Sequence, residues 1–176
     1  MNRRLVLKGG LALGSALLLA ACGFKLRGAV TFAFDTIAVI ASQNGAVAAE
    51  LRNALGSRLR DAGTATASSA TGTTAPTPPQ VTLEILQELR ERSVAGVNAA
   101  GQVRELQLRI RVKFRLRNAS GKDVIEDTEI LQQRDISFSE SAVLAKEVEE
   151  ALLYRNMQTD IVQQLLRRLA AVKSIT

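Results

Sequence analysis

The sequence contains no histidine, no tryptophan, a single cysteine and few aromatic residues, five phenylalanines and one tyrosine. Without histidine, the chain lacks the commonest general base and a favoured zinc ligand. A single cysteine cannot form a disulfide within the chain, so stability depends on packing. So few aromatic side chains give no stacking platform for single-stranded nucleic acid. These absences argue against a histidine-based enzyme, a metal centre and a nucleic-acid-binding protein.

The uncharged stretch near the N-terminus is too short to cross a bilayer. It covers residues 9–21, whereas a spanning helix needs about 20 apolar residues. Three cations precede it, Arg3, Arg4 and Lys8. This is the layout of a cleaved export signal. The stretch ends in Leu19-Ala20-Ala21-Cys22, which resembles the lipobox of bacterial lipoproteins. We therefore predict a signal peptide over residues 1–21 and lipidation, with palmitate among the acyl chains, at Cys22.

By the same resemblance, two or three acyl chains on Cys22 anchor the mature protein to a membrane without a spanning helix. Gly23 rather than aspartate follows the cysteine, and the sorting of Gram-negative lipoproteins then favours the periplasmic side of the outer membrane. The pair Arg3-Arg4 leaves both Sec and twin-arginine export open. Removal of 21 residues from 176 leaves 155, with 20 cations and 17 acids. A net charge of +3 on a chain of that length suits one domain and gives no argument for nucleic acid.

After the signal, the pattern predicts a tether, a strand and a helix. Residues 22–36 form the tether that leads in from the lipid. Residues 37–41 are uniformly apolar, which predicts a strand buried on both faces. A helix is predicted from apolar residues four positions apart, Val47, Leu51, Leu55 and Leu59. We expect a cap at Ser42 or Asn44 and a stop at Gly63.

A low-complexity loop separates this helix from a β meander. Residues 64–80 are mostly Thr, Ala, Ser, Gly and Pro and hold all three prolines, so we predict a mobile loop, with a short strand over 64–67 as an open alternative. Apolar and polar residues then alternate in two segments, 81–93 and 106–116, and a last long strand is predicted over 122–138. The turns between them are predicted at 98–101 and 118–121, where Gly121 suits the positive φ of a bulged hairpin loop.

The last third of the chain is predicted to be helical. Its apolar stripe consists of Leu144, Val148, Leu152, Tyr154, Met157, Ile161, Leu165 and Leu169. Ser139 or Ser141 is expected to cap it. Together these elements predict an α+β two-layer sandwich, with a mixed, mostly antiparallel sheet of about four strands and two amphipathic helices on one face. We expect one domain over residues 37–176.

The central strand carries a cation at every second position, which allows two interpretations. A three-residue turn at 119–121 would place the cations opposite acids in the pairs Arg117–Asp123, Lys113–Asp127 and Arg111–Glu129. The favoured interpretation is a self-neutralised outer face that also discourages edge aggregation. Arg109 and Arg115 lack an obvious acid in that register. They are therefore the better candidates for binding an outside anion such as a phosphate-bearing lipid.

Three stretches resemble the LptE family of lipopolysaccharide-assembly lipoproteins. They are Cys22-Gly23-Phe24-Lys25-Leu26-Arg27-Gly28, Leu144-Ala145-Lys146-Glu147, and an ending with Tyr154, Met157, Asp160, Gln164, Leu165, Arg168 and Leu169. The resemblance implies a 1:1 complex with the outer-membrane β-barrel LptD, which such proteins plug and support while lipopolysaccharide moves to the outer leaflet. It also implies lipopolysaccharide contacts at Lys146 and near Ala99, where Arg104 would have to substitute for a basic residue.

No catalytic constellation is evident, so we predict no enzyme activity, no cofactor and no metal. Histidine is absent, and the acidic cluster Glu147, Glu149 and Glu150 is better interpreted as a solvated helix face than as a metal site. The alternative function is a free-standing periplasmic lipid-binding lipoprotein, an accessory of a transporter. Co-purification with one large β-barrel would separate the two functions.

Overall fold

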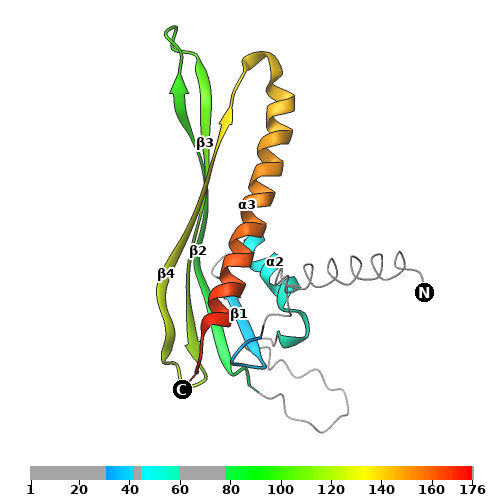
Figure 1. Ribbon diagram of the computed structural model, residues 1–176, viewed down its shortest axis with the longest axis vertical. Coiled ribbons are helices and arrows are strands. Elements are labelled where there is room, and N and C mark those ends of the chain that lie inside the picture. Colours follow the sequence, from blue (N-terminus) through cyan, green and yellow to red (C-terminus); the bar gives the residue numbers. More distant parts are fainter. Residues whose placement is uncertain (1–30, 42–44, 60–77, 176) are drawn as a thin grey trace, which may run out of the picture. The chain divides into compact units, whose positions relative to one another are not determined.

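The sheet has four strands in the order β1-β2-β3-β4 (Figure 1). We describe a computed structural model that covers residues 31–41, 45–59 and 78–175. The strands are β1 (Ile37–Ala41), β2 (Val81–Val97), β3 (Val103–Asn118) and β4 (Asp123–Ser137). β1 pairs with β2 in parallel, and the other two pairs are antiparallel. The predicted signal peptide, Cys22, most of the tether, the stop at Gly63 and nearly all of the 64–80 loop lie outside the described residues.

Two helices cover one face of this sheet, which confirms the predicted α+β class (Figure 1). They are α2 (Ala46–Leu55) and the long α3 (Val143–Ala171), and each adjoins a short 3₁₀ turn, Gly56–Arg58 after α2 and Glu140–Ala142 before α3. None of the helices in the described part of the chain combines the length and apolarity needed to cross a membrane.

The core lies between the helices and the inner face of the sheet. On β3 the predicted alternation holds throughout, because every second residue is buried: Leu106, Leu108, Ile110, Val112, Phe114 and Leu116. The helices contribute Val47, Leu51, Leu55, Met157, Ile161, Val162, Leu165 and Leu169. Removing a buried leucine from such a core costs about 2–5 kcal/mol. The contiguous core therefore holds the sheet and both helices as one packed unit.

Both predicted turns are confirmed. Gly121 adopts φ +83° and its N–H donates to the Asn118 carbonyl at 3.0 Å. The Asn118 N–H in turn donates to the Lys122 carbonyl at 2.9 Å, which closes a three-residue loop. Asn98 closes the other turn in the same way, through a 2.9 Å bond from its N–H to the Gln102 carbonyl.

The end of α2 and the start of α3 differ from the prediction, whereas the expected caps of α2, Ser42 and Asn44, lie outside the described residues. α2 begins after Gly45 with no side-chain cap and ends at Gly56, whose φ of +51° favours glycine. Leu59 lies beyond the helix and bridges to Ile37 of β1. Neither serine caps α3, because the 3₁₀ turn precedes it and its N-terminal flanking residue is Ala142.

The strand β1 is only partly buried, contrary to the prediction. Ile37 and Ala38 are fully buried, but Ile40 is 44 % exposed. β1 lies at the edge of the sheet, where β2 is its one neighbouring strand among the described residues and only Ile37 is bridged on the other side, by Leu59. Because β1 is a short edge strand, one of its faces is uncovered near its C-terminal end, and the Ile40 side chain is exposed there.

A bulge between Ile85 and Gln87 reverses the faces of β2. Before the bulge, Leu83 and Ile85 point into the core; after it, the even-numbered residues pair with core positions of β3, as Glu88 does with Val112. The sequence predicted Leu89 as a core residue, but it is 38 % exposed. A bulge adds one residue to the strand, so every later side chain of that strand changes to the other face of the sheet. The even-numbered charged residues Glu88, Arg90 and Arg92 therefore face the helices, whereas Glu91 pairs with the outward-facing Arg109.

Candidate functional site

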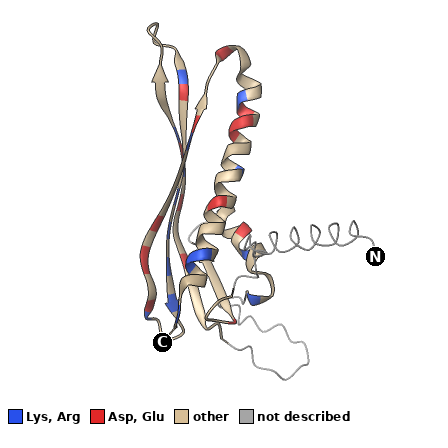
Figure 2. Ribbon diagram, in the orientation of Figure 1, with Lys and Arg blue, Asp and Glu red and all other residues tan. Residues whose placement is uncertain are grey.

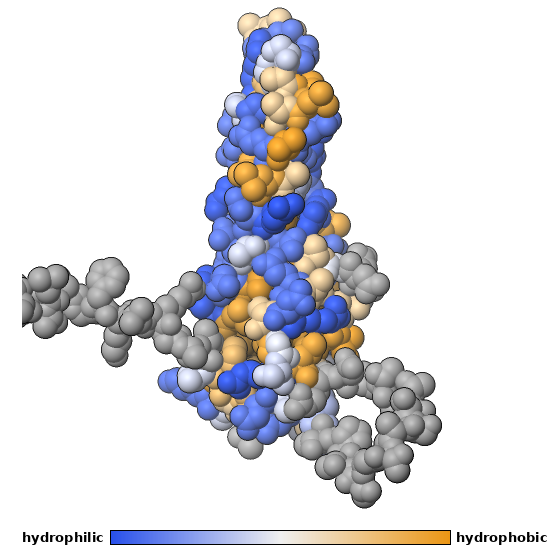
Figure 3. All heavy atoms as spheres, turned by 90° about the vertical axis from the view of Figure 1, so that its right-hand side faces the viewer, coloured by the Kyte–Doolittle hydropathy of each residue, from blue (hydrophilic) through white to orange (hydrophobic). Residues whose placement is uncertain are grey.

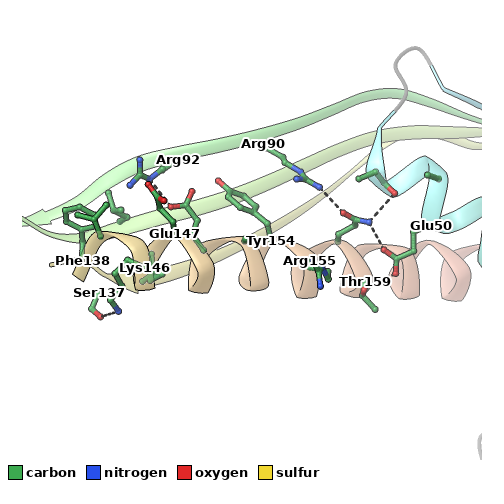
Figure 4. A pocket seen from close by; sticks show the side chains of 18 of the residues that line it. Glu50, Arg90, Arg92, Ser137, Phe138, Lys146, Glu147, Tyr154, Arg155 and Thr159 are labelled. Carbon is green, nitrogen blue, oxygen red and sulfur yellow. Dashed lines mark hydrogen bonds and ion pairs between the residues drawn. The ribbon is translucent and has the colours of Figure 1, made fainter. Parts of the chain in front are cut away.

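An open groove of about 1110 Å³ lies between the second half of β2, the ends of β3 and β4, α2 and the first half of α3 (Figure 4). The β2 bulge supplies its charged wall, because it turns Arg90 and Arg92 inwards. The groove combines apolar and charged side chains, among them Leu106, Ile136, Phe138, Val143, Arg90, Arg92, Lys146, Glu147, Glu150 and Arg155.

Polar contacts rather than apolar packing hold the first half of α3 across this groove. The Tyr154 hydroxyl donates to the Glu91 carbonyl at 2.8 Å, and the Arg90 guanidinium lies 5.6 Å from the centre of the Tyr154 ring. Arg92 forms an ion pair with Glu150 at 3.2 Å. Burial of the ring raises the pKa of Tyr154, and the nearby Glu150 carboxylate raises it further. The strand side of the groove thus presents the cations Arg90 and Arg92, whereas the helix side presents both acids and cations, Glu147 and Glu150 beside Lys146 and Arg155.

Gln158 lines the groove and joins α3 to both α2 and β2. Its amide donates to the Ala46 carbonyl at 3.2 Å and to Glu50 at 2.7 Å, while its oxygen accepts from Arg90 at 2.8 Å. Thr159 donates to the same Glu50 carboxylate at 2.9 Å. No apolar periodicity marked this junction, because the side chains that form it, Glu50, Arg90, Gln158 and Thr159, are polar.

Two of the four predicted cations, Lys146 and Arg104, meet at one end of the sheet. The Lys146 ammonium lines the groove and donates to Ser137 at 2.9 Å and to Glu149 at 2.8 Å. Its side chain is 21 % exposed, so it is more covered than a freely solvated cation. The carbonyl of Arg104 accepts from the N–H of Phe138, next to Ser137, at 2.8 Å. The exposed Arg104 side chain donates to Gln102 at 3.2 Å.

The other two, Arg109 and Arg115, lie on the opposite, outer face of the sheet. Arg115 is not without acids, contrary to the prediction: it contacts Glu84 at 2.6 Å and Asp127 at 3.7 Å. Within the described residues Arg109 forms no ion pair, and its buried Nε has no hydrogen-bond acceptor. Arg109 therefore remains the more available of the two for an outside anion.

On the outer face, the cations of β3 lie beside acids of β4 and form a charge ladder, as the favoured interpretation predicted (Figure 2). The predicted register holds for Arg117 and Asp123 but fails beyond two irregularities near Leu116. As a result Lys113 rather than Arg111 lies directly opposite Glu129, which contacts both at 4.0 Å and 3.5 Å. The hydrogen bond to Asp123 raises the pKa of Arg117. The cations are thus matched mainly within the sheet.

An exposed apolar stripe on α3 is the main feature that sequence reasoning misplaced. Leu144, Val148 and Leu152 are 79 %, 71 % and 53 % exposed, whereas the prediction had them packed on the sheet. The apolar surface over the first half of α3 is visible in Figure 3. The signal was present in the spacing: a five-residue step from Leu152 to Met157 rotates the stripe by about 140° instead of about 40°. We call Leu144, Val148 and Leu152 the outer stripe.

In the residues that the structure describes, no three His, Cys, Asp or Glu side chains gather as metal ligands would. In the groove, Arg92 pairs with Glu150, and Lys146 pairs with Glu149 beside it. The architecture is that of an α+β protein with one sheet face under helices and the other face open.

Comparison with known proteins agrees with this architecture. Residues 34–169 match the family model described as LptE: Lipopolysaccharide-assembly. Since the match covers well over half of the sequence, the chain belongs to the LptE lipopolysaccharide-assembly family. No curated protein matches the chain at a significant level.

Among solved structures, the solution structure of an uncharacterized lipoprotein B from Nitrosomonas europaea is similar, with a TM-score of 0.66, 29 % identity and coverage of 85 % of this chain and 91 % of that one. Rare lipoprotein B from Shewanella oneidensis has a TM-score of 0.60 and 19 % identity, over 77 % of this chain and 94 % of its own. A minor lipoprotein from Acinetobacter baumannii has a TM-score of 0.58 and 17 % identity, over 80 % and 94 %. The last two show the fold alone.

Proposed function

We propose that the protein is an outer-membrane lipoprotein that forms a 1:1 complex with the β-barrel LptD, which it plugs and supports during insertion of lipopolysaccharide into the outer leaflet. Membership of the LptE family carries this proposal. The signal peptide over residues 1–21 and the acyl anchor on Cys22 supply the address, and residues 37–176 form the working domain. The role is non-enzymatic.

Two surfaces are suited to such a partner. Barrel lumens are polar, and the outer sheet face presents both charges, largely matched among themselves. The outer stripe on α3 is apolar and unpartnered within the described residues, and clustered exposed aliphatic side chains often mark protein contacts.

The test is purification from the native membrane with a tag placed after Thr176. After gentle solubilisation, one large β-barrel should co-purify at near 1:1, and depletion of the tagged protein should leave that barrel misassembled. Val148→Glu should lower the barrel yield, because it places a charge in the outer stripe. Ala100→Glu, in the exposed β2–β3 turn and outside both surfaces, is the matched control. Recovery of the tagged protein alone would overturn the proposal.

For lipopolysaccharide itself, we propose contacts at Lys146, Arg104, Arg109 and Arg115. Lys146→Glu should weaken capture of lipopolysaccharide while barrel assembly stays intact; lost assembly would reassign Lys146 to scaffolding. Reversal of Arg109 and Arg115 together tests the outer face by titration with an anionic glycolipid. Since Arg115 is engaged by two acids, Arg109→Glu alone should account for most of any loss. Unchanged binding with intact folding would exclude this face.

The alternative function, a free-standing periplasmic lipid-binding lipoprotein, is favoured by one observation, the open groove beside α3. That protein would come out of the membrane without a barrel and would bind lipid on its own. The same purification therefore decides between the two functions.

A further inference from the structure

The strand β4 forms one edge of the sheet, and no described strand lies beyond it (Figure 1). From Thr128 to Ser137 its register with β3 runs without interruption, and we call these residues the free edge. Resting on the proposed complex with a barrel, we propose that the free edge receives an extended segment of the partner as an added strand. This segment carries basic side chains at alternate positions and comes from a part of the partner outside the barrel wall.

The pairing of β4 with β3 determines which of its backbone groups point away from the sheet. The Phe138 N–H donates to the Arg104 carbonyl at 2.8 Å, so Phe138 bonds to β3. In an antiparallel pair every second residue bonds to the neighbouring strand, and the residues between them point away from it. Because the register is continuous back to Thr128, the even-numbered residues bond to β3. The N–H and C=O groups of the odd-numbered residues therefore point to the open side: Glu129, Leu131, Gln133, Asp135 and Ser137.

Few features of the free edge oppose the addition of a strand. Proteins protect exposed edges with proline, lysine, bulges or inward-pointing charges. Residues 128–137 contain no proline, glycine or lysine, and the irregularities of β4 lie before Thr128. The guanidinium of Arg134 donates to the Gln133 carbonyl at 3.3 Å and contacts Asp160 of α3 at 3.3 Å. An added strand would have to displace this side chain from one carbonyl alone.

The side chains next to the open backbone groups define the chemistry of the segment. Asp135 forms no ion pair with any described residue and accepts from the neutral Gln107 amide at 3.0 Å. Glu129 is 38 % exposed, and its contacts with the β3 cations are long, 3.5 and 4.0 Å. Leu131, between them, is 46 % exposed. Since opposite charges across a strand pair stabilise it, we expect basic side chains beside Glu129 and Asp135 and an aliphatic one beside Leu131.

The charges of the strands exclude a second copy of β4 as the occupant. β3 carries six cations and one acid, whereas β4 carries five acids and one cation, so a basic strand continues the alternation. The one cation of β4, Arg134, pairs with the core position Leu108 and therefore lies on the helix side. A second β4 would thus offer no cation to the outer face in any register. The strands of a closed barrel wall have no free edge, so the segment comes from outside that wall.

Hydrogen exchange resolved to single amides tests the added strand directly, because the two sets of amides on β4 should respond differently. The mature protein alone is compared with the complex co-purified from the native membrane. The amides of the odd-numbered residues 131, 133 and 135 should exchange at least about tenfold more slowly in the complex. The amides of the even-numbered residues 130, 132 and 134 should exchange slowly in both samples, because they already bond to β3.

Reversal of Glu129 and Asp135 together to lysine tests the chemistry of the segment. In the complex of this variant, the odd-numbered amides should lose most of their slowing, because like charges then face each other. Glu126→Lys is the matched control, because Glu126 is exposed on the same strand but lies before the free edge. Urea denaturation of the free variants checks their folding. Equal effects of the two variants would overturn the assignment of a basic segment to the free edge.

The exchange experiment also separates this inference from the proposed function. Unchanged exchange of the odd-numbered amides in the complex, or equal slowing of both sets, would overturn the added strand and leave the complex itself established. Slow exchange of the odd-numbered amides already in the free protein at high concentration would assign the edge to a second copy and overturn the proposed occupant. Failure to isolate any complex with a barrel would overturn the proposed function and this inference with it.

Discussion

The carboxylate of Glu88 on β2 accepts hydrogen bonds from the backbone N–H of Val47, in the first turn of α2, at 3.2 and 3.3 Å. This contact replaces the missing side-chain cap, because Gly45 precedes the helix and has no side chain to offer. A Cβ at Gly45 would overlap the Glu88 carboxylate. The β2 bulge turns Glu88 to this face. This irregularity of the strand therefore lets Glu88 hold the start of α2 at Val47, which lies 41 residues earlier in the sequence.

Glu88→Ala should therefore lower the free energy of unfolding by about 1–2 kcal/mol, the usual loss when a helix cap is removed. Urea denaturation measures the change. Glu126→Ala is the control, because this glutamate is exposed on β4 and should cost less than about 0.5 kcal/mol. Equal losses in the two variants would show that Glu88 does not stabilise α2.

Gly45→Ala should also destabilise the protein, because the new methyl group displaces the Glu88 carboxylate. The backbone φ of –76° at Gly45 suits alanine, so the cost comes from the side chain alone. In a Glu88→Ala background, Gly45→Ala should thus cost almost nothing. A double-mutant cycle by urea denaturation measures this coupling, and strictly additive costs would contradict the steric explanation.

Truncation of a leucine to alanine should lower the free energy of unfolding strongly in the second half of α3 and hardly at all in the first half. Leu165→Ala removes a fully buried side chain and should cost about 2–5 kcal/mol. Leu144→Ala removes a side chain that is 79 % exposed and should change the free energy of unfolding by less than about 0.5 kcal/mol. Thermal or urea unfolding of both variants, free of any partner, makes the comparison. A large loss for Leu144→Ala would mean that the outer stripe is part of the core.

The sequence was a good guide wherever one periodicity ran undisturbed. The alternation from Leu106 to Leu116 and the glycine of the 118–121 turn were enough to predict β3 and its hairpin, because a strand has only two faces. The predicted layer arrangement followed from counting such segments. For the same reason, the pairing of Arg117 with Asp123, next to the turn, was predicted correctly.

Prediction failed where geometry was set by a distant contact. Nothing local to residues 81–97 marks the bulge after Ile85, yet it decides that Glu88, Arg90 and Arg92 line the groove. On α3, Leu144 has the same spacing to Val148 as the buried residues have among themselves, and only the surrounding fold decides which series is covered. The groove was therefore beyond reach from sequence, although Lys146, Glu147, Glu150 and Tyr154 on its helix side had been singled out.

Glu84 links two arginines on the outer face and should be the strongest point of the charge ladder. It contacts Arg115 at 2.6 Å and Arg117 at 3.3 Å, with its side chain 20 % exposed. A double-mutant cycle between Glu84 and Arg115 should give a coupling of about 1 kcal/mol or more, because the pair is partly shielded from water. The more exposed pair of Arg111 and Glu129 should give less, within the range of about 0.2–1 kcal/mol for surface pairs. A larger coupling for that second pair would contradict this ranking.

Tyr154 should make stability fall at high pH. Burial raises the pKa of its hydroxyl above the ordinary value of 10.0, so above that pH the folded protein retains a proton that the unfolded chain has lost. The free energy of unfolding then decreases as the pH rises, and the contribution is complete only below pH about 10. Tyr154→Phe lacks this titration. At neutral pH it should cost about 0.5–1.5 kcal/mol, for the lost hydrogen bond to the Glu91 carbonyl.

The two proteins should consequently converge in stability as the pH is raised from 8 to 11, measured by urea denaturation at each pH. Lysines titrate over the same range in both, so only the difference between the two curves reports on Tyr154. A constant difference across the series would mean that the Tyr154 hydroxyl ionises as readily in the groove as in the unfolded chain. The first half of α3 would then be less firmly held to β2 than its contacts with Glu91 and Arg92 indicate.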